Sequence, residues 1–93
     1  MYHENVLVFK NIPYSYQKSS FLSLMMTMRL PLPYAFNYYF RDGIFHGLAF
    51  ANFTDSKDAS TVFCALLGRE IDGRKLRVEF KEARPKETML TRK

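Results

Sequence analysis

The chain has 93 residues and is long enough for one small domain with a two-layer core. A hydrophobic content of 47%, with 16% aromatic residues, excludes global disorder. No apolar run reaches about 18 residues and no signal-peptide pattern opens the chain, so no membrane span is expected. The single cysteine, Cys64, excludes an internal disulfide, and two histidines cannot complete a zinc site with it. We therefore expect no metal and no cofactor, and a reducing compartment, the cytoplasm or the nucleus.

The net charge of +5 is distributed unevenly. Residues 73–93 contain eight basic and three acidic side chains and so carry the whole excess, whereas residues 1–72 are neutral. A positive last strand and tail favour a polyanionic partner. The alternative is a solvated basic tail that only keeps the protein soluble.

The first elements are a strand and a helix. Residues 6–12 form a predicted strand that Pro13 ends, with Val8 and Lys10 facing outward. The helix is predicted over 17–30, because an apolar stripe recurs at helical spacing; its members are Phe21, Leu24, Met25 and Met28. Leu22 and Met26 lie off this stripe and could form a small protein-contact patch. Pro31 and Pro33 are expected to stop this helix.

A second predicted strand, residues 34–41, is rich in aromatic residues. Strand periodicity directs Tyr34, Phe36 and Tyr38 toward the helices, and Ala35, Asn37 and Tyr39 toward the open face. Asp42-Gly43 predicts a hairpin turn, with Ile44 and Phe45 in its loop.

The third predicted strand, residues 46–53, carries large apolar residues on both faces. Leu48, Phe50 and Asn52 share one face, and Ala49, Ala51 and Phe53 share the other. An exposed aromatic side chain on a sheet needs a reason, and base stacking is one.

The remaining elements complete the order β-α-β-β-α-β. Asp55 is the predicted N-cap of a second helix that Gly68 closes; its buried stripe is Ala59, Val62, Phe63 and Leu66. In the last strand Leu76, Val78 and Phe80 alternate with the outward-facing Arg77, Glu79 and Lys81. This order predicts an α+β fold, the ferredoxin-like split β-α-β-β-α-β sandwich, with two helices on one face of a four-stranded antiparallel sheet. We expect a lead-in over 1–5, the domain over 6–83 and a basic, flexible tail over 84–93.

Residues 46–53 resemble the RNP1 motif of the RNA-recognition motif (RRM) family. Gly47, Ala49, Phe50 and Phe53 fit this motif, whereas His46 replaces the usual Lys or Arg and Leu48 replaces an aromatic residue. Residues 7–12 resemble the RNP2 motif, with Val8 in the slot of another aromatic residue. The passage 68–78 also matches the family, so the resemblance covers about residues 5–83. Residues 30–53 further resemble RRMs of fungal cell-cycle and checkpoint RNA-binding proteins.

The resemblance implies that the sheet face binds single-stranded RNA. We expect a monomer, since neither predicted helix offers a broad second apolar face. Phe50 is then the retained stacking residue. Each stack that is missing, at Val8 and at Leu48, would cost about 1–3 kcal/mol of binding free energy. We therefore expect weak to moderate affinity. The expected RNA-binding residues are Val8, Lys10, Asn37, Tyr39, Arg41, His46, Leu48, Phe50, Asn52, Arg77, Lys81 and Arg84.

Two alternatives belong to other functional classes. A protein-binding RRM would use the helix face or the apolar sheet face. The U2AF-homology branch of such RRMs is disfavoured, because Arg69-Glu70-Ile71 lacks the aromatic residue of its loop and residues 17–30 contain no Asp or Glu. A ferredoxin-like enzyme is also disfavoured, because the sequence shows no carboxylate pair, no activated nucleophile and no phosphate-binding glycine loop. No catalytic residue is predicted.

Overall fold

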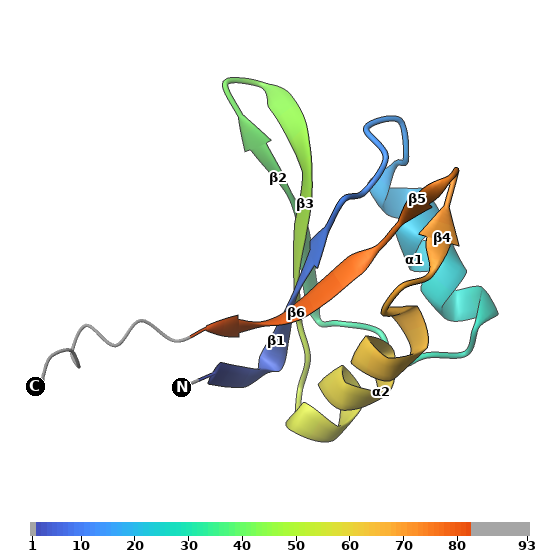
Figure 1. Ribbon diagram of the computed structural model, residues 1–93. Coiled ribbons are helices and arrows are strands. Elements are labelled where there is room, and N and C mark those ends of the chain that lie inside the picture. Colours follow the sequence, from blue (N-terminus) through green and yellow to red (C-terminus); the bar gives the residue numbers. More distant parts are fainter. Residues whose placement is uncertain (1, 83–93) are drawn as a thin grey trace, which may run out of the picture.

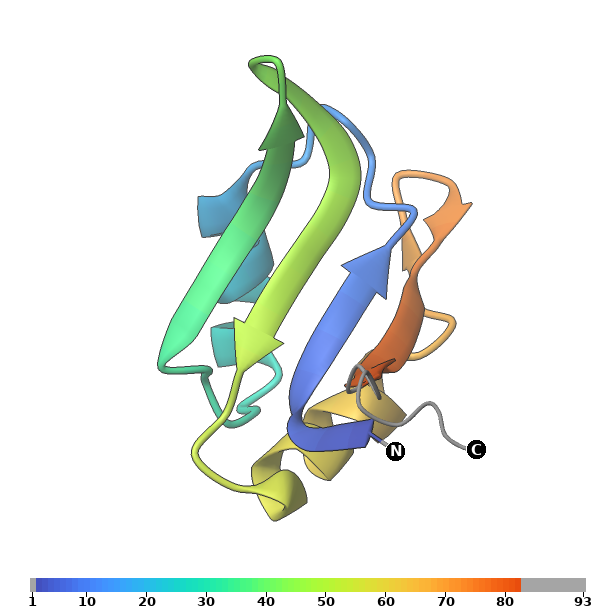
Figure 2. The same ribbon diagram turned by 90° about the vertical axis from the view of Figure 1, so that its left-hand side faces the viewer.

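The computed structural model describes residues 2–82 (Figure 1). The four long strands form one antiparallel sheet in the order β2-β3-β1-β6, and β4 and β5 form a separate two-stranded hairpin. Both helices cover one face of the sheet, and within residues 2–82 the other face is free of helices (Figure 2). The predicted fold class is confirmed. The elements are β1 (Tyr2–Lys10), α1 (Lys18–Thr27), β2 (Ala35–Arg41), β3 (Ile44–Asn52), α2 (Ser56–Leu66), β4 (Glu70–Ile71), β5 (Arg74–Lys75) and β6 (Arg77–Glu82).

The core lies between the sheet and the helices, as the alternation in the strands predicts. Inward-facing strand residues are buried; they are Leu7, Phe9, Phe36, Ala49, Ala51 and Val78. Phe21 and Met25 of α1 are fully buried against them. On α2, Phe63 stacks on Phe80 of β6, with ring centroids 4.9 Å apart and an interplanar angle of 17°. Within residues 2–82, neither helix is long and apolar enough to cross a membrane.

Helix α1 is shorter than predicted, because its own backbone ends it before Pro31. Arg29 adopts a left-handed φ of 58°. Its N–H donates to the Met26 carbonyl at 3.0 Å, and the Leu30 N–H donates to the Met25 carbonyl at 2.9 Å. This pair of bonds is a Schellman motif, which satisfies the last carbonyls of a helix. Helix α2 begins as predicted: the Asp55 side chain accepts a hydrogen bond from the Asp58 N–H at 2.9 Å.

The ends of β1 and β2 differ from the prediction. Strand β1 runs over Tyr2–Lys10 instead of 6–12, because Asn11 adopts a left-handed φ of 66° that turns the backbone out of the sheet. Strand β2 begins at Ala35, so the inward alternation does not include Tyr34, which is 70% exposed. The prediction that Tyr34 faces the helices is therefore wrong, whereas Phe36 and Tyr38 do pack against the core.

The β2–β3 turn is tighter than predicted. Asp42 and Gly43 both have positive φ, 54° and 78°, as the two central residues of a type I′ turn require. Ile44 and Phe45 lie in β3 and not in a loop, since Phe45 pairs with Phe40. The Phe45 ring stacks on Tyr38, with centroids 4.3 Å apart and an angle of 9°.

Gly47 marks an irregularity in the β2–β3 pairing. Phe40 pairs with Phe45, but Tyr38 already pairs with Ala49, so β3 has extra residues at this point. Gly47 has a φ of 74°, and a Cβ atom there would lie 3.0 Å from the Ile12 carbonyl oxygen. Glycine is therefore required both for the backbone conformation and for the close approach of the loop that follows β1.

Candidate nucleic-acid interface

One row of paired residues crosses the open face of all four long strands. Asn37 pairs with Phe50, Phe50 with Val8, and Val8 with Glu79. Because strand side chains alternate between faces, these four residues lie on the side away from the helices, which Figure 2 shows toward the viewer. The register thus places side chains from four separate strands side by side.

An apolar platform lies in the middle of this row. Phe50 and Leu48 are half-buried, and Val8 is only 8% exposed. Val8 does not belong to the core cluster under the helices, so residues of the open face cover it. A hollow at the β6 edge of the platform is lined on the open face by Val8, Leu48, Phe50 and Lys81, and on the helix side by residues of α2 and β6. A flat apolar group can therefore contact Phe50 and Leu48, with Val8 as the floor.

Tyr39 extends the platform toward β2. It is 39% exposed, and its ring meets Phe50 edge-on, with centroids 6.5 Å apart and an angle of 82°. The His46 ring lies 6.1 Å from Tyr39 on the other side. The structure thus brings Tyr39, His46 and Phe50 together, as expected for residues of one face.

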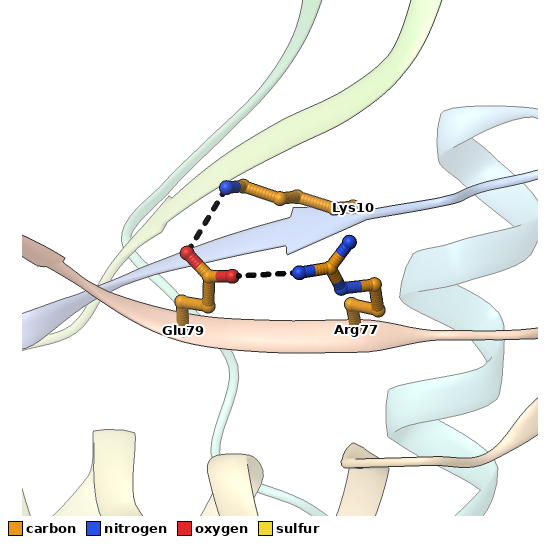
Figure 3. Close-up of polar contacts among 3 residues, drawn as sticks. All are labelled: Lys10, Arg77 and Glu79. Atoms are coloured by element: carbon orange, nitrogen blue, oxygen red, sulfur yellow. Dashed lines mark hydrogen bonds and ion pairs between the residues drawn. The ribbon is translucent and has the colours of Figure 1, made fainter.

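Charged side chains border the platform on β1 and β6. Glu79 holds two cations: its Oε1 lies 3.0 Å from Lys10 Nζ, and its Oε2 lies 3.5 Å from Arg77 Nη2 (Figure 3). The ammonium group of Lys81 lies 6.0 Å from the centroid of the Phe50 ring. Three cations and one carboxylate therefore lie along this edge of the platform, which carries a net positive charge.

The other expected residues lie at varying distances from Phe50. Asn52 follows two residues after Phe50 in β3 and pairs with Val6 and Ala35, so it borders the platform on the same face. Arg41 pairs with Ile44 at the far end of the hairpin and is not part of the cluster. Arg84 and the predicted tail over 84–93 lie outside the described residues.

Sequence reasoning placed Glu79 on the open face but did not include it among the site residues. Its position between Lys10 and Arg77 depends on the β1–β6 register, in which Lys10 pairs with Arg77 and Val8 with Glu79. A pattern in a single strand does not contain that register. The one available signal was the charge alternation of Arg77, Glu79 and Lys81.

No protein-family model matches the chain. The chain is 53% identical over 81 residues to the Saccharomyces cerevisiae RNA-binding protein PIN4, a match that covers 87% of the chain and 12% of the relative. It is 49% identical over 79 residues to the Schizosaccharomyces pombe RNA-binding post-transcriptional regulator cip2, a match that covers 85% of the chain and 14% of the relative. The fold superposes on the structure of the Rna15 RRM with bound RNA (GU) with a TM-score of 0.71 and 21% identity, covering 85% and 84% of the two chains. The chain folds as an RRM domain.

In this RRM fold the RNP2-like and RNP1-like segments lie in the adjacent strands β1 and β3. The Val8–Phe50 pair joins the two motifs in the centre of the open face. The predicted relationship to RRMs of fungal RNA-binding proteins is confirmed by the identity to PIN4 and cip2. The chain spans only about an eighth of the length of these relatives. They are named as RNA-binding proteins, and an enzymatic function has no support from them.

Proposed function

We propose that this RRM domain, as a monomer, binds single-stranded RNA on its open sheet face. The observation that carries the proposal is the apolar platform of Phe50, Leu48 and Val8 on a face free of helices, with cations along its edge. Nucleic-acid bases stack on such platforms, and basic side chains hold the phosphates. The relatives named as RNA-binding proteins and the Rna15 RRM with bound RNA (GU) support this proposal.

The composition of the platform favours weak to moderate affinity. Two positions that carry aromatic residues in the RNP motifs are Val8 and Leu48, which offer no ring for stacking. Each base–aromatic stack contributes about 1–3 kcal/mol to the free energy of binding. The lack of aromatic rings at these two positions therefore lowers the affinity by several orders of magnitude at most. Tyr39 partly replaces them, since its ring lies next to Phe50. We therefore expect dissociation constants in the micromolar range.

Protein binding through the first helix is the competing function, and the structure gives it a small surface. Met26 is 62% exposed, but Leu22 packs against the core. The apolar patch that these two residues were expected to share therefore consists of an exposed Met26 and a partly buried Leu22.

The test is an amide-shift NMR titration of the 93-residue chain with short single-stranded RNAs at two salt concentrations. We expect shifts at Val8, Phe50, Asn52 and the residues of β6. Binding should weaken with salt by a log–log slope of about −0.7 for each phosphate that the protein contacts. Shifts around Met26 alone, or no shifts on the open face, would contradict RNA binding there.

A further inference from the structure

A second hollow lies beyond the end of the platform, between the loop after β1 and the β4–β5 hairpin. It is lined by Lys10, Asn11, Ile12, Tyr14, His46, Gly47, Arg74 and Arg77. Lys10 also lines the hollow beside the platform, so the two depressions are neighbours on either side of this side chain. Three of the lining side chains, Lys10, Arg74 and Arg77, are cationic, and none of the lining side chains is acidic.

Arg74 is the cation that distinguishes this pocket. Its Nε donates a hydrogen bond to Asn11 Oδ1 at 3.2 Å, and its guanidinium carbon lies 5.7 Å from the centroid of the Tyr14 ring. Asn11 is held in turn, because its Nδ2 donates to the Lys75 carbonyl at 2.9 Å. Among residues 2–82, the ion pairs on this side of the molecule involve Lys10 and Arg77 but not Arg74. A neutral amide and an aromatic ring thus orient the guanidinium without neutralising it, and its terminal N–H groups remain available.

Tyr14 owes its position to Gly47. The Cε1 atom of Tyr14 would lie 3.3 Å from a Cβ atom at position 47, so glycine allows the ring to lie directly against β3. The Phe45 ring meets Tyr14 edge-on, with centroids 6.3 Å apart. The Tyr14 ring, which is 67% exposed, therefore lies between Phe45 of the β2–β3 hairpin and Arg74.

We infer that this pocket binds a phosphate group of an RNA strand that continues off the sheet face. The inference rests on the proposed function and extends it. Arg74 presents a planar set of donors that suits phosphate oxygens. Lys10 and Arg77 share a single carboxylate, Glu79, so the pocket keeps an excess of positive charge. A strand whose bases lie on Phe50 reaches Arg74 by passing Lys10.

The experiment compares two RNAs by fluorescence anisotropy. The first has about four nucleotides, enough to cover the platform. The second is the same RNA extended at its 5′ or its 3′ end by two abasic ribose phosphates, which add phosphates without adding bases. The unmodified chain should bind one of the extended RNAs about five- to tenfold more tightly than the short one.

Arg74→Gln and Arg69→Gln are the matched variants. Arg74→Gln should lose the gain from the extension, bind the short RNA as before, and reduce the salt slope for the extended RNA by about 0.7. Arg69→Gln removes the same charge from an exposed side chain that does not line the pocket, and it should keep the gain. The amide spectrum of each variant verifies that it is folded.

The outcomes separate the two proposals. If the unmodified chain binds neither RNA, the proposed function is wrong. If it binds the short RNA but gains nothing from either extension, the phosphate pocket is wrong and sheet-face binding stands. An equal loss with Arg74→Gln and Arg69→Gln would likewise overturn the pocket, because it would show a general effect of charge.

Discussion

The carboxylate of Glu79 on β6 lies 3.0 Å from the ammonium group of Lys10 on β1, across the open face of the sheet. The same carboxylate also contacts Arg77. A negative charge therefore occupies the surface on which we propose that a polyanion binds. It orders two cations, but it also reduces the attraction that they exert on phosphates.

Replacing Glu79 should strengthen RNA binding. In Glu79→Gln the two cations lose their partner, and we expect a gain of about two- to fivefold in affinity at low salt. The gain is small because all three side chains are more than one-third exposed and water screens the pair. The measurement is the dissociation constant for a short single-stranded RNA at two salt concentrations. Glu70→Gln on β4 is the control, and a loss of affinity with Glu79→Gln would indicate that the carboxylate accepts hydrogen bonds from a base.

Phe50→Ala should weaken RNA binding by about 1–3 kcal/mol, because it removes the aromatic ring at the centre of the platform. The matched control is Phe40→Ala. Phe40 is an exposed phenylalanine of the same hairpin, but it pairs with Phe45 near the turn and does not line the platform. Both variants are titrated with the same RNA after their amide spectra have been compared. Equal effects of the two substitutions would argue against a specific stack on Phe50.

Leu48→Phe should strengthen binding, because it adds a ring beside Phe50 where the RNP1 motif has one. Leu48 is half-buried, so its side chain has room to grow toward solvent. Val8 is less suitable, since it is almost covered and a larger side chain would displace its neighbours. We expect a gain of about 1 kcal/mol or more for Leu48→Phe, measured by anisotropy. Ile44→Phe adds a similar ring to an exposed position at the hairpin tip and should leave the affinity unchanged.

The stability of the domain should fall above pH 10, in part because of Tyr38. The Tyr38 hydroxyl donates to the Tyr16 carbonyl at 2.9 Å. Burial, and to a lesser degree the nearby Tyr16, raises the pKa of Tyr38 above its ordinary value of 10.0. The folded chain therefore keeps Tyr38 neutral at a pH where the unfolded chain ionises it. The stabilisation is complete below pH 10.0 and is lost progressively as the pH rises.

Tyr38→Phe tests this pH dependence. At neutral pH the variant should be about 1 kcal/mol less stable than the unmodified chain, because it lacks one hydrogen bond. The difference between the two free energies of unfolding, measured in urea, should shrink above pH 10. Tyr39→Phe, which removes a hydroxyl from the open face, is the matched control for the loss of a tyrosine hydroxyl. A constant difference for Tyr38→Phe would contradict the raised pKa.

The N-cap residues of the two helices, Asp55 and Gln17, allow a matched comparison of their effects on stability. Asp55→Ala should lower the free energy of unfolding by about 1 kcal/mol, because the Asp55 side chain caps α2 by accepting a hydrogen bond from the Asp58 N–H. Gln17→Ala should cost much less, since the side chain of this N-cap makes no capping hydrogen bond. Urea unfolding of both variants measures the difference. Similar losses would indicate that the Asp55 hydrogen bond contributes little.

The strand faces were predictable because one face of the sheet is buried. A shift of one residue would move Phe9 or Ala49 out of the core, so the alternation determines the register of β1 and β3. The end of α1 was not predictable in the same way. The left-handed residue of its Schellman motif is Arg29, where a glycine would have given a sequence signal.

The candidate site was predictable where it lies within a motif. Phe50, Leu48 and Val8 follow from the RNP-like segments, and the structure brings them together. The contact between Asn11 and Arg74 joins residues 63 positions apart, and no local pattern contains it. The left-handed backbone of Asn11, which accompanies this contact, also moved the end of β1 from the predicted position.

Gly47 divides β3 into two segments that differ in how many neighbouring strands they pair with. Residues 49–52 are paired on both sides, with β1 and with β2, whereas Ile44 and Phe45 pair with β2 alone. A segment held on one side opens at a lower free energy than a segment held on both. The hairpin end can therefore open and close while the centre of the sheet stays intact. Tyr39 and His46 lie at this end of the sheet. If the open face binds RNA as we propose, they would form a rim that adjusts to bases of different size beside a more rigid floor.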